Sequence, residues 1–308
     1  MKRIAKTLLI RSVRALPRGA KYAILDELTN YPWAFEAAGK FAIKAGLRGF
    51  VAEGECGVIR GALDDDAALA RYASDGVWSP RQTALLKELL AGHGGTYLDV
   101  GANIGLTLIP IARDHRVTCH AFEPDPANFR YLRENVAVNC DACNVALYNI
   151  ALYDREARLP FELAERHSGD HRISLTDAEG ELGEHLRRKV QVSTKRLDDV
   201  LAAWSDPLVV KMDVQGSEPF VIAGGRNTLS QASLLCMEFW PYSMRRMEGD
   251  VGAVIAFVAE HFEEGSISPG DKNAPINWQS IDAVASFLEK FARSATTLEY
   301  LDVVVRKV

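Results

Sequence analysis

A glycine-containing turn between an apolar segment and the next helical pattern is the first part of this sequence that could do chemistry. It reads DVGANIG at residues 99–105 and continues the apolar segment 96–100. Where a strand turns into a helix, glycines let the backbone approach a ligand closely and let the helix pack tightly on the strand. The turn therefore predicts a ligand site at the carboxyl end of a strand, with Gly101 beside the ligand and Gly105 at the helix–strand contact.

A carboxylate at Glu123 makes this prediction more specific. Glu123 follows the next apolar segment, 117–122, and could accept hydrogen bonds from both hydroxyls of a ribose. The dinucleotide fingerprint would place a glycine where this chain has Asn103, so that a pyrophosphate could approach. Asp99, just before the turn, would repel a phosphate and attract the ammonium group of a methionine moiety. The residues favour S-adenosylmethionine over NAD, although an NAD-dependent oxidoreductase stays open as a reading of the same turn.

Two later apolar segments also end in carboxylates. Asp213 follows segment 208–212, and Glu238 lies at the end of segment 234–239. In a parallel sheet both would face the same crevice as the turn. Methyl transfer is an in-line displacement on a sulfonium, and a hydroxyl acceptor must also lose its proton. Asp213 could take that proton or orient the acceptor, or it could cap the next helix, for which Ser217 is the more natural residue. The aromatic residues after Glu238 could form an apolar acceptor wall or part of the core.

Two histidines complete the set of catalytic candidates. His167 and His171 flank a Ser-Gly-Asp segment inside the polar stretch 164–189, which shows no secondary-structure period. A loop of this kind could close over the acceptor and supply a base that titrates near neutral pH. The alternative is that both side chains are merely exposed. Asp213, Glu238, His167 and His171 are therefore the candidate catalytic residues.

Strand and helix patterns alternate from residue 79 onward, which predicts an α/β fold with a parallel sheet covered on both faces. Ser79 and Gln82 have the spacing of a capping box, with Pro80 at the first helical position. Asp125 is expected to cap the helix that begins at Pro126. Pro110 predicts a kink or a late start in the helix after the glycine turn. The expected strands are 96–100, 117–122, 144–150, 190–194, 208–212, 234–239 and 297–306.

These segments together resemble the FkbM-type methyltransferase family. The resemblance rests on residues 99–105, AFEPDP at 121–126 with Asn135 and Asn139, NIALYD at 149–154, RLDD at 196–199, KMDVQG at 211–216, and Glu238. It implies a Rossmann-like class I methyltransferase, with a mostly parallel, doubly wound sheet and an antiparallel C-terminal strand. It also implies that Asp99, Gly101 and Asn103 hold the methionine end of the cofactor, Glu123 the ribose and Asp154 the adenine amino group. Glutamate is usual where this chain has Gln215.

Composition limits the classes of partner. Of the 308 residues, 48% are hydrophobic and 25% charged, as in ordinary globular proteins, and the net charge of -5 disfavours non-specific binding to nucleic acid. Five cysteines, an odd count, indicate a reducing compartment, so a cytoplasmic location is expected. The C-x-x-C pair formed by Cys140 and Cys143 has no second pair or histidine cluster beside it, so no metal is expected. No apolar run approaches the length of a transmembrane helix.

Two domains are expected: a mainly helical lead-in over residues 1–78, and a cofactor-binding methyltransferase domain over residues 79–308. The lead-in should contain a short strand pair near residues 50–59 and a solvated helix start at the three aspartates 64–66. Residues 1–23 contain seven basic and no acidic side chains. Such a segment could make a weak peripheral contact with an anionic membrane, or be a surface helix facing water.

The sequence thus predicts an S-adenosylmethionine-dependent methyltransferase that methylates a hydroxyl of a small molecule, natural product or glycan. One alternative is an N-methyltransferase, although the D/N-P-P-Y/F signature of nucleobase amino methylation does not follow Lys211. The other is a non-catalytic cofactor-binding or scaffold protein, which Gln215 keeps open. The identity of the acceptor and the oligomeric state are not specified by these patterns.

Overall fold

A parallel sheet forms the centre of the molecule. In the computed structural model, which describes residues 20, 49–62, 65, 67–140, 144–165, 167–270 and 273–308, the large sheet has the strand order β13-β12-β14-β11-β10-β3-β4-β5. Its parallel strands are β5 (Val145–Tyr148), β4 (Val117–Phe122), β3 (Gly95–Val100), β10 (Leu208–Met212) and β11 (Leu234–Phe239). The chain order reverses between β3 and β10, which is where ligands bind in open α/β sheets.

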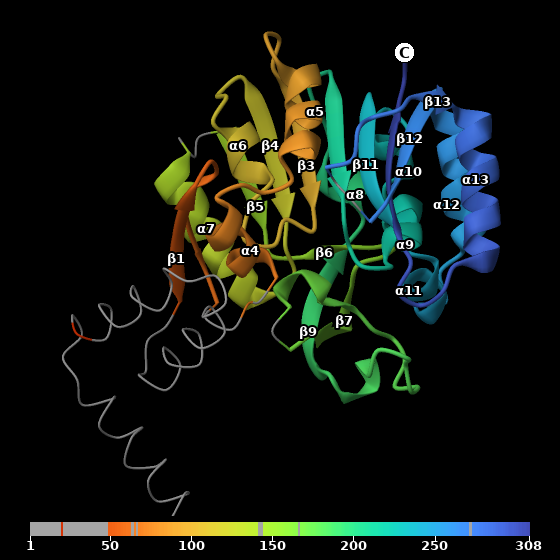
Figure 1. Ribbon diagram of the computed structural model, residues 1–308, viewed down its shortest axis with the longest axis horizontal. Coiled ribbons are helices and arrows are strands. Elements are labelled where there is room, and N and C mark those ends of the chain that lie inside the picture. Colours follow the sequence, from red (N-terminus) through yellow and green to blue (C-terminus); the bar gives the residue numbers. More distant parts are fainter. Residues whose placement is uncertain are drawn as a thin grey trace, which may run out of the picture.

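The strands beyond β11, toward one edge of the sheet, are antiparallel. β14 (Leu301–Arg306) pairs antiparallel with β11, which confirms the expected C-terminal strand. Beyond it lie β12 (Glu264–Pro269) and the short β13 (Gln279–Ser280), also antiparallel, which the sequence patterns did not predict. The mixed sheet with helices on both faces is the Rossmann-like fold expected (Figure 1).

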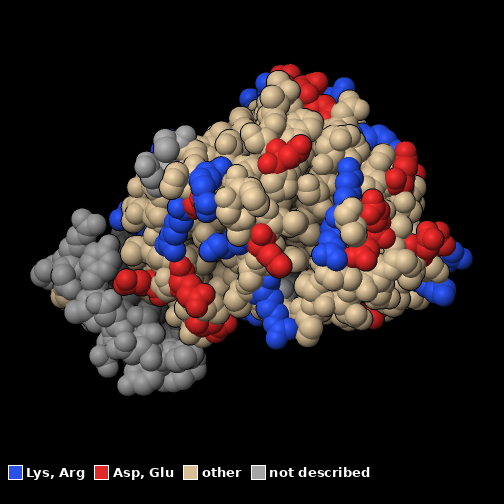
Figure 2. Space-filling model, turned by 90° about the horizontal axis from the view of Figure 1, so that it is seen from above, with Lys and Arg blue, Asp and Glu red and all other residues tan. Residues whose placement is uncertain are grey.

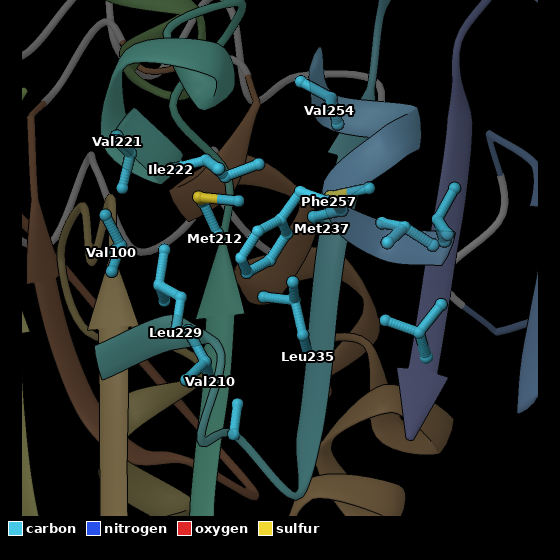
Figure 3. Close-up of a cluster of buried hydrophobic side chains, with 14 of the residues drawn as sticks. Val100, Val210, Met212, Val221, Ile222, Leu229, Leu235, Met237, Val254 and Phe257 are labelled. Carbon is cyan, nitrogen blue, oxygen red and sulfur yellow. The ribbon is translucent and has the colours of Figure 1, made fainter. Parts of the chain in front are cut away.

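One face of the sheet packs against the helices that follow β10. These are α9 (Glu218–Gly224), α10 (Arg226–Leu229), α12 (Val251–His261) and α13 (Ile281–Ser294). Figure 3 shows Val210 and Met212 of β10 and Leu235 of β11 pointing toward Ile222 of α9 and Phe257 of α12. Alternate residues of a strand point to opposite faces, so this cluster uses every second side chain of each strand.

The remaining side chains of the same strands pack on the opposite face. Its helices are α5 (Pro80–Leu90), α6 (Leu108–Ala112), α7 (Pro126–Asn139) and α4 (Ala68–Asp75), and it also includes the hairpin of β1 (Phe50–Gly54) and β2 (Gly57–Gly61). The hairpin confirms the predicted strand pair. Side-chain amides of Asn135 and Asn139 pair with the backbone of Arg60 and Val58, which fixes the hairpin on α7. The predicted helices and basic segment of residues 1–19 and 21–48 lie outside the described residues.

Helix starts test the capping predictions directly. The Asp125 side chain accepts from the Asn128 amide, as predicted, and α6 begins late, at Leu108, so that Pro110 falls in its first turn. The capping box at Ser79 is wrong. Its φ of 41° is left-handed, whereas an N-cap side chain reaches the first helical amides from the β region. The prediction for Ser217 is also wrong, because its side chain makes no capping bond.

The segment between β5 and β10 builds a second, smaller sheet. Its strands, in the order β6-β9-β7-β8, are β6 (Ala151–Leu152), β9 (Arg188–Lys195), β7 (Ala157–Leu163) and β8 (Arg172–Ile173). The sequence predicted part of β9 and an irregular stretch before it, but missed β7. The irregular stretch contains the 3-10 turns η3 (Ser168–Asp170) and η4 (Glu184–Leu186). Two further short helices, α8 (Leu197–Val200) and α11 (Pro241–Arg246), follow later in the chain.

Three smaller expectations can be compared with the described residues. Of the three aspartates 64–66, residues 64 and 66 lie outside the described residues. Asp65 is buried rather than solvated, and its carboxylate accepts from the amides of Ala67 and Ala68 at the start of α4. Cys140 is a free thiol, while Cys143 lies outside the described residues. No helix within the described ranges is long and apolar enough to cross a bilayer.

Candidate active site

A cavity of about 480 Å³ opens at the carboxyl ends of β3, β4, β10 and β11, where the order of the parallel strands reverses. This volume is typical of a site for a small ligand or cofactor. Both polar and apolar side chains line it. The predicted site residues among them are Gly101, Asn103, Glu123, His167, His171, Asp213 and Glu238.

The glycine turn supplies one wall of the cavity through its backbone. Gly101 has a φ of 84°, and a Cβ atom there would lie 2.0 Å from the Asp213 carbonyl oxygen, so no other residue fits. The amides of Gly101 and Ala102 both donate to the Phe122 carbonyl at 3.0 Å. Asn103 also adopts a left-handed conformation, with a φ of 51°. The turn is therefore fixed between β4 and the residues after β10.

Glu123 is buried at the edge of the cavity and holds the turn. Its Oε2 accepts from the Asn103 amide and its Oε1 from the Asp125 amide, each at 2.8 Å. Burial raises the pKa of Glu123 from 4.5 to about 8, against the lowering effect of these two amides. Each carboxylate oxygen has a second lone pair, so further hydroxyl donors can be accommodated.

Asp99 lies beneath the turn rather than in the cavity. Its side chain is buried, and its Oδ1 is 3.1 Å from Lys211 Nζ, which also donates to the Gly101 carbonyl at 2.6 Å. Lys211 itself lines the cavity. The pairing of β3 with β10 places Lys211 directly opposite Asp99, so the carboxylate already has a cationic partner in the protein. The contact of Asp99 with the methionine ammonium stays a prediction.

Two other predicted cofactor residues are not among the residues that line the cavity. Gly105 lies behind the turn, where a Cβ atom would come within 2.9 Å of Leu132 on α7. It permits tight packing, which is the helix-contact role predicted from its position. Asp154 is half-buried outside the cavity and pairs with Arg155 at 3.0 Å. The adenine contact implied for Asp154 by resemblance stays a prediction.

At the ends of β10 and β11, two carboxylates on the cavity wall accept from one amide. Gln215 Nε2 donates to Asp213 Oδ1 at 2.8 Å and to Glu238 Oε1 at 2.9 Å. Both carboxylates line the cavity and come from neighbouring strands, β10 and β11. The sequence placed Asp213 and Glu238 in one crevice, but it gave no role to Gln215.

The two histidines lie in the segment that covers the turn. The hydroxyl of Ser168 donates to Asp65 at 2.6 Å and accepts from the side-chain Nδ2 of Asn103 at 3.3 Å. His171 is half-buried, burial lowers its pKa, and its Nδ1 accepts from the Ala164 amide. A neutral imidazole with Nδ1 as acceptor carries its proton on Nε2, so His171 is a donor rather than a ready base. His167 is exposed at the rim of the cavity.

Several cavity residues were not predicted as site residues. They are Lys211, Gln215, Ser168, Trp78, Gln82, Asn273 and Tyr300. Lys211 had a detectable signal, because a lysine inside an otherwise apolar parallel strand is unusual and calls for a partner. Trp78, Asn273 and Tyr300 come from segments far apart in the sequence, and no local pattern marks them.

Comparison with known proteins identifies the class and then the family. Residues 99–264, more than half of the chain, match the model of the family described as Methyltransferase FkbM domain. The Rossmann-like sheet, the glycine turn and this match define a class I methyltransferase that uses S-adenosylmethionine, which sets aside the NAD-dependent reading. The chain belongs to the FkbM methyltransferase family.

Two curated relatives carry specific names. The chain is 31% identical over 161 residues to the 2-O-methyltransferase NoeI of Sinorhizobium fredii, covering 46% of this chain and 62% of that protein. It is 27% identical over 197 residues to the 31-O-demethyl-FK506 methyltransferase FkbM of Streptomyces tacrolimicus, covering 54% of this chain and 72% of that protein. Among solved structures, a methyltransferase from Agrobacterium tumefaciens aligns over 85% of this chain and 71% of its own, with 10% identity and a TM-score of 0.42, a similarity too distant to carry an inference.

Proposed function

We propose that this protein is an O-methyltransferase that methylates a hydroxyl group of a small molecule, natural product or glycan. The observation that carries the proposal is the pair of carboxylates, Asp213 and Glu238, in the wall of the same cavity that the glycine turn lines. A hydroxyl needs a proton acceptor when it attacks, and a carboxylate can supply one. The names of the two curated relatives both refer to methylation of an oxygen, which supports the same class of acceptor.

The side chains around the turn fit the cofactor chemically. Lys211 Nζ, held by Asp99 and the Gly101 carbonyl, offers a cation for the methionine carboxylate. Glu123 retains acceptor capacity for the two ribose hydroxyls. The apolar stretch 150–152 and Phe122 offer a surface for the adenine ring. In this arrangement Asp99 acts on the cofactor through Lys211, and Gly105 through the packing of the turn.

At the reacting end, the chain's own residues align the acceptor and receive its proton. When bound, S-adenosylmethionine supplies a methyl group on a sulfonium, so the acceptor O–C bond forms as the S–C bond breaks and the electron pair stays on sulfur. Asp213 or Glu238 takes the hydroxyl proton. His171 donates a hydrogen bond from Nε2, which orients the acceptor, and His167 at the rim offers a second polar contact. Trp78 and Tyr300 add aromatic surface that suits a ring-shaped acceptor.

The described part of the N-terminal lead-in contributes to this site. We therefore propose that the lead-in and the methyltransferase domain share one continuous core across residue 78 and are not independent folding units. α4 contributes Ala68 and Arg71 to the cavity wall, and it packs against the β1–β2 hairpin. The face in Figure 2 has basic and acidic side chains interspersed, and the described residues visible on that face form no continuous basic surface. This charge pattern suits a small acceptor better than a nucleic acid.

The proposal is tested by cofactor binding and by methyl transfer measured separately. S-adenosylhomocysteine should bind in calorimetry, and Glu123→Gln should weaken it, while the exposed control Glu260→Gln should not. Labelled methyl transfer is then measured against matched panels of hydroxyl and amine acceptors. Transfer to hydroxyls that is lost in Asp213→Asn supports the proposal. Transfer confined to amines, or cofactor binding without turnover on either panel, would overturn it in favour of N-methylation or of a non-catalytic protein.

A further inference from the structure

The amide of Gln215 occupies an unusual position, between two carboxylates that come from different strands. Its Nε2 donates one hydrogen bond to Asp213 Oδ1 at 2.8 Å and the other to Glu238 Oε1 at 2.9 Å. Glu238 is buried, while Asp213 and Gln215 are half-buried at the cavity wall. Both N–H groups of the side-chain amide therefore donate to carboxylate oxygens, one on Asp213 and the other on Glu238.

Two ionised carboxylates this close together are stable only with a proton, a cation or a hydrogen-bond donor between them. Since both lie within hydrogen-bond reach of one nitrogen, their charges repel, and such pairs commonly share a proton or bind a cation. A primary amide is a neutral alternative, because its two N–H donors stabilise the ionised form of both acids without adding a titrating group. We propose that Gln215 is a positioning residue that holds Asp213 and Glu238 apart, ionised and aimed into the cavity, in the place that a shared proton or a divalent cation would otherwise take.

The backbone around Gln215 is built to present this amide. Its φ of 56° is left-handed, and its carbonyl accepts from the Ser243 hydroxyl at 2.6 Å. The buried Arg172 donates to the same hydroxyl at 2.7 Å. On the other side, the Glu218 carboxylate accepts from the amides of Val214 and Gly216 at 3.1 and 2.9 Å. The turn is thus held independently of the Gln215 side chain, so that side chain can be altered without removing its support.

Other charged groups surround the pair and must be considered in any pH experiment. Lys211 and Asp99 lie on the strand side, and Glu218 lies below the turn. Burial raises the pKa of Glu218 to about 7. Arg172 is linked to the Gln215 carbonyl through its hydrogen bond to the Ser243 hydroxyl. Further groups are His167, His171 and Glu123 in the same cavity, and Asp302, which is opposite Glu238 on β14. A variant must therefore be compared with the unaltered protein at each pH, so that these shared contributions cancel.

The first test measures thermal stability against pH in the protein without cofactor. Gln215→Met keeps the length of the side chain but removes both donors. We expect the melting temperature to fall by about 5 °C at pH 8, and the deficit to shrink to about 1–2 °C at pH 4.5, because a proton taken up between the two carboxyls of the variant would then replace the lost donors. Gln231→Met, an exposed control, should show no pH-dependent deficit. A deficit for Gln215→Met that is the same at both pH values would mean that Gln215 only packs, and would overturn the proposal.

The second test uses Mn²⁺ alone as the probe, followed by electron paramagnetic resonance. Gln215→Glu replaces the donor by a third carboxylate, so the variant should bind Mn²⁺ at least about tenfold more tightly than the unaltered protein. The added affinity should disappear in the double variant Gln215→Glu/Asp213→Asn. Equal Mn²⁺ affinity of the single variant and the unaltered protein would contradict the proposal.

The catalytic consequence of this inference rests on the proposed function, but the two can fail separately. Loss of S-adenosylhomocysteine binding or of transfer to hydroxyls would count against the proposed function and would leave the stability and Mn²⁺ results standing. Normal transfer in Gln215→Met, with an unchanged pH–rate profile, would show instead that the amide has no positioning role.

Discussion

The two ends of the cavity are built in different ways. The end that we propose for the cofactor comes from short pieces close together in the sequence: the turn at 99–105, Glu123 and the segment 150–152. Its geometry is fixed by backbone contacts, such as the Gly101 and Ala102 amides on the Phe122 carbonyl. The end that we propose for the acceptor gathers side chains from α4 and α5, the segment before β8, the strand ends of β10 and β11, and the chain between β12 and β14.

This difference predicts how each end responds to substitution. A backbone-built wall tolerates most side-chain changes and fails where a side chain cannot fit. A wall built from side-chain networks depends on buried polar partners, and the removal of one partner leaves the others unpaired. The acceptor end should therefore be the more easily altered by single substitutions at polar residues, and the cofactor end by substitutions at glycines.

The largest effect is expected at Arg172, the centre of the acceptor-side network. Its side chain is fully buried, ion-paired with Asp170 and Glu162, stacked on Trp240 at 4.8 Å and hydrogen-bonded to Ser243. Arg172→Met removes the buried cation and leaves Arg187 as the one remaining arginine paired with both Asp170 and Glu162, and this shortfall of positive charge should lower the free energy of unfolding by about 3–5 kcal/mol in urea titrations. Arg293→Met, an exposed control, should cause no measurable change. An effect of Arg172→Met no larger than that control would remove the contrast between the two ends.

The next effect is expected at Gly101, the point where the cofactor end touches the acceptor end. An alanine there would be strained at a φ of 84° and would meet the Asp213 carbonyl. Strain and overpacking together cost about 2–5 kcal/mol, so Gly101→Ala should weaken S-adenosylhomocysteine binding about 100-fold or more in calorimetry. Gly92→Ala is the matched control, because Gly92 has a φ of 85° but open space around its Cα. If both variants bind equally well, the close approach at Gly101 does not shape the site.

The cofactor end was largely readable from the sequence because its signals are local. The Asp125 cap, the strands on either side of the turn and the positions of Glu123, Asp213 and Glu238 at strand ends all follow from patterns of a few residues. Such patterns depend on hydrogen bonds and periodicities within one helix or strand. They can therefore be recognised without knowing which other element packs against it.

What could not be predicted depends on which strands become neighbours. β12 has the sequence EGSISP, whose glycine, serines and proline do not favour a strand, and it forms because β14 offers it an edge. β7 contains Pro160 and pairs with β9 some thirty residues later. The pairing of Lys211 with Asp99 likewise follows from the register of β10 on β3, which no single segment of the sequence contains.

A moderate, pH-dependent effect is expected at Glu123. Since burial raises its folded-state pKa to about 8 while the unfolded value stays near 4.5, the folded protein keeps a proton that the unfolded chain loses. Its contribution to stability is thus full below about pH 4.5 and is lost as pH rises through 8. Glu123→Gln should flatten this decline in unfolding titrations between pH 5 and 8, whereas an unchanged slope would show that another group causes it.

The same carboxyl should give cofactor binding the opposite trend. Ribose hydroxyls donate best to the ionised form, so affinity for S-adenosylhomocysteine should rise with pH up to about 8, by at most about tenfold per pH unit. Glu123→Gln should bind roughly ten- to one-hundredfold more weakly at pH 8 and lose most of this pH dependence. Calorimetry at pH 6, 7 and 8 measures both. A pH dependence equal to that of the unaltered protein would place the titrating group elsewhere.

The smallest effect is expected at Asp154, where family resemblance and the structure lead to different expectations. Resemblance implies a hydrogen bond to the adenine amino group, which would make Asp154→Ala weaken binding about tenfold or more. The side chain instead pairs with the exposed Arg155, outside the cavity, and the residues that line this part of the wall are the apolar 150–152. We therefore expect S-adenosylhomocysteine affinity to change by less than about threefold, since an exposed ion pair contributes little. A tenfold loss, with the melting temperature unchanged, would mean that the 150–154 segment moves when the cofactor binds, and that even the backbone-built end of the cavity completes its shape only around its ligand.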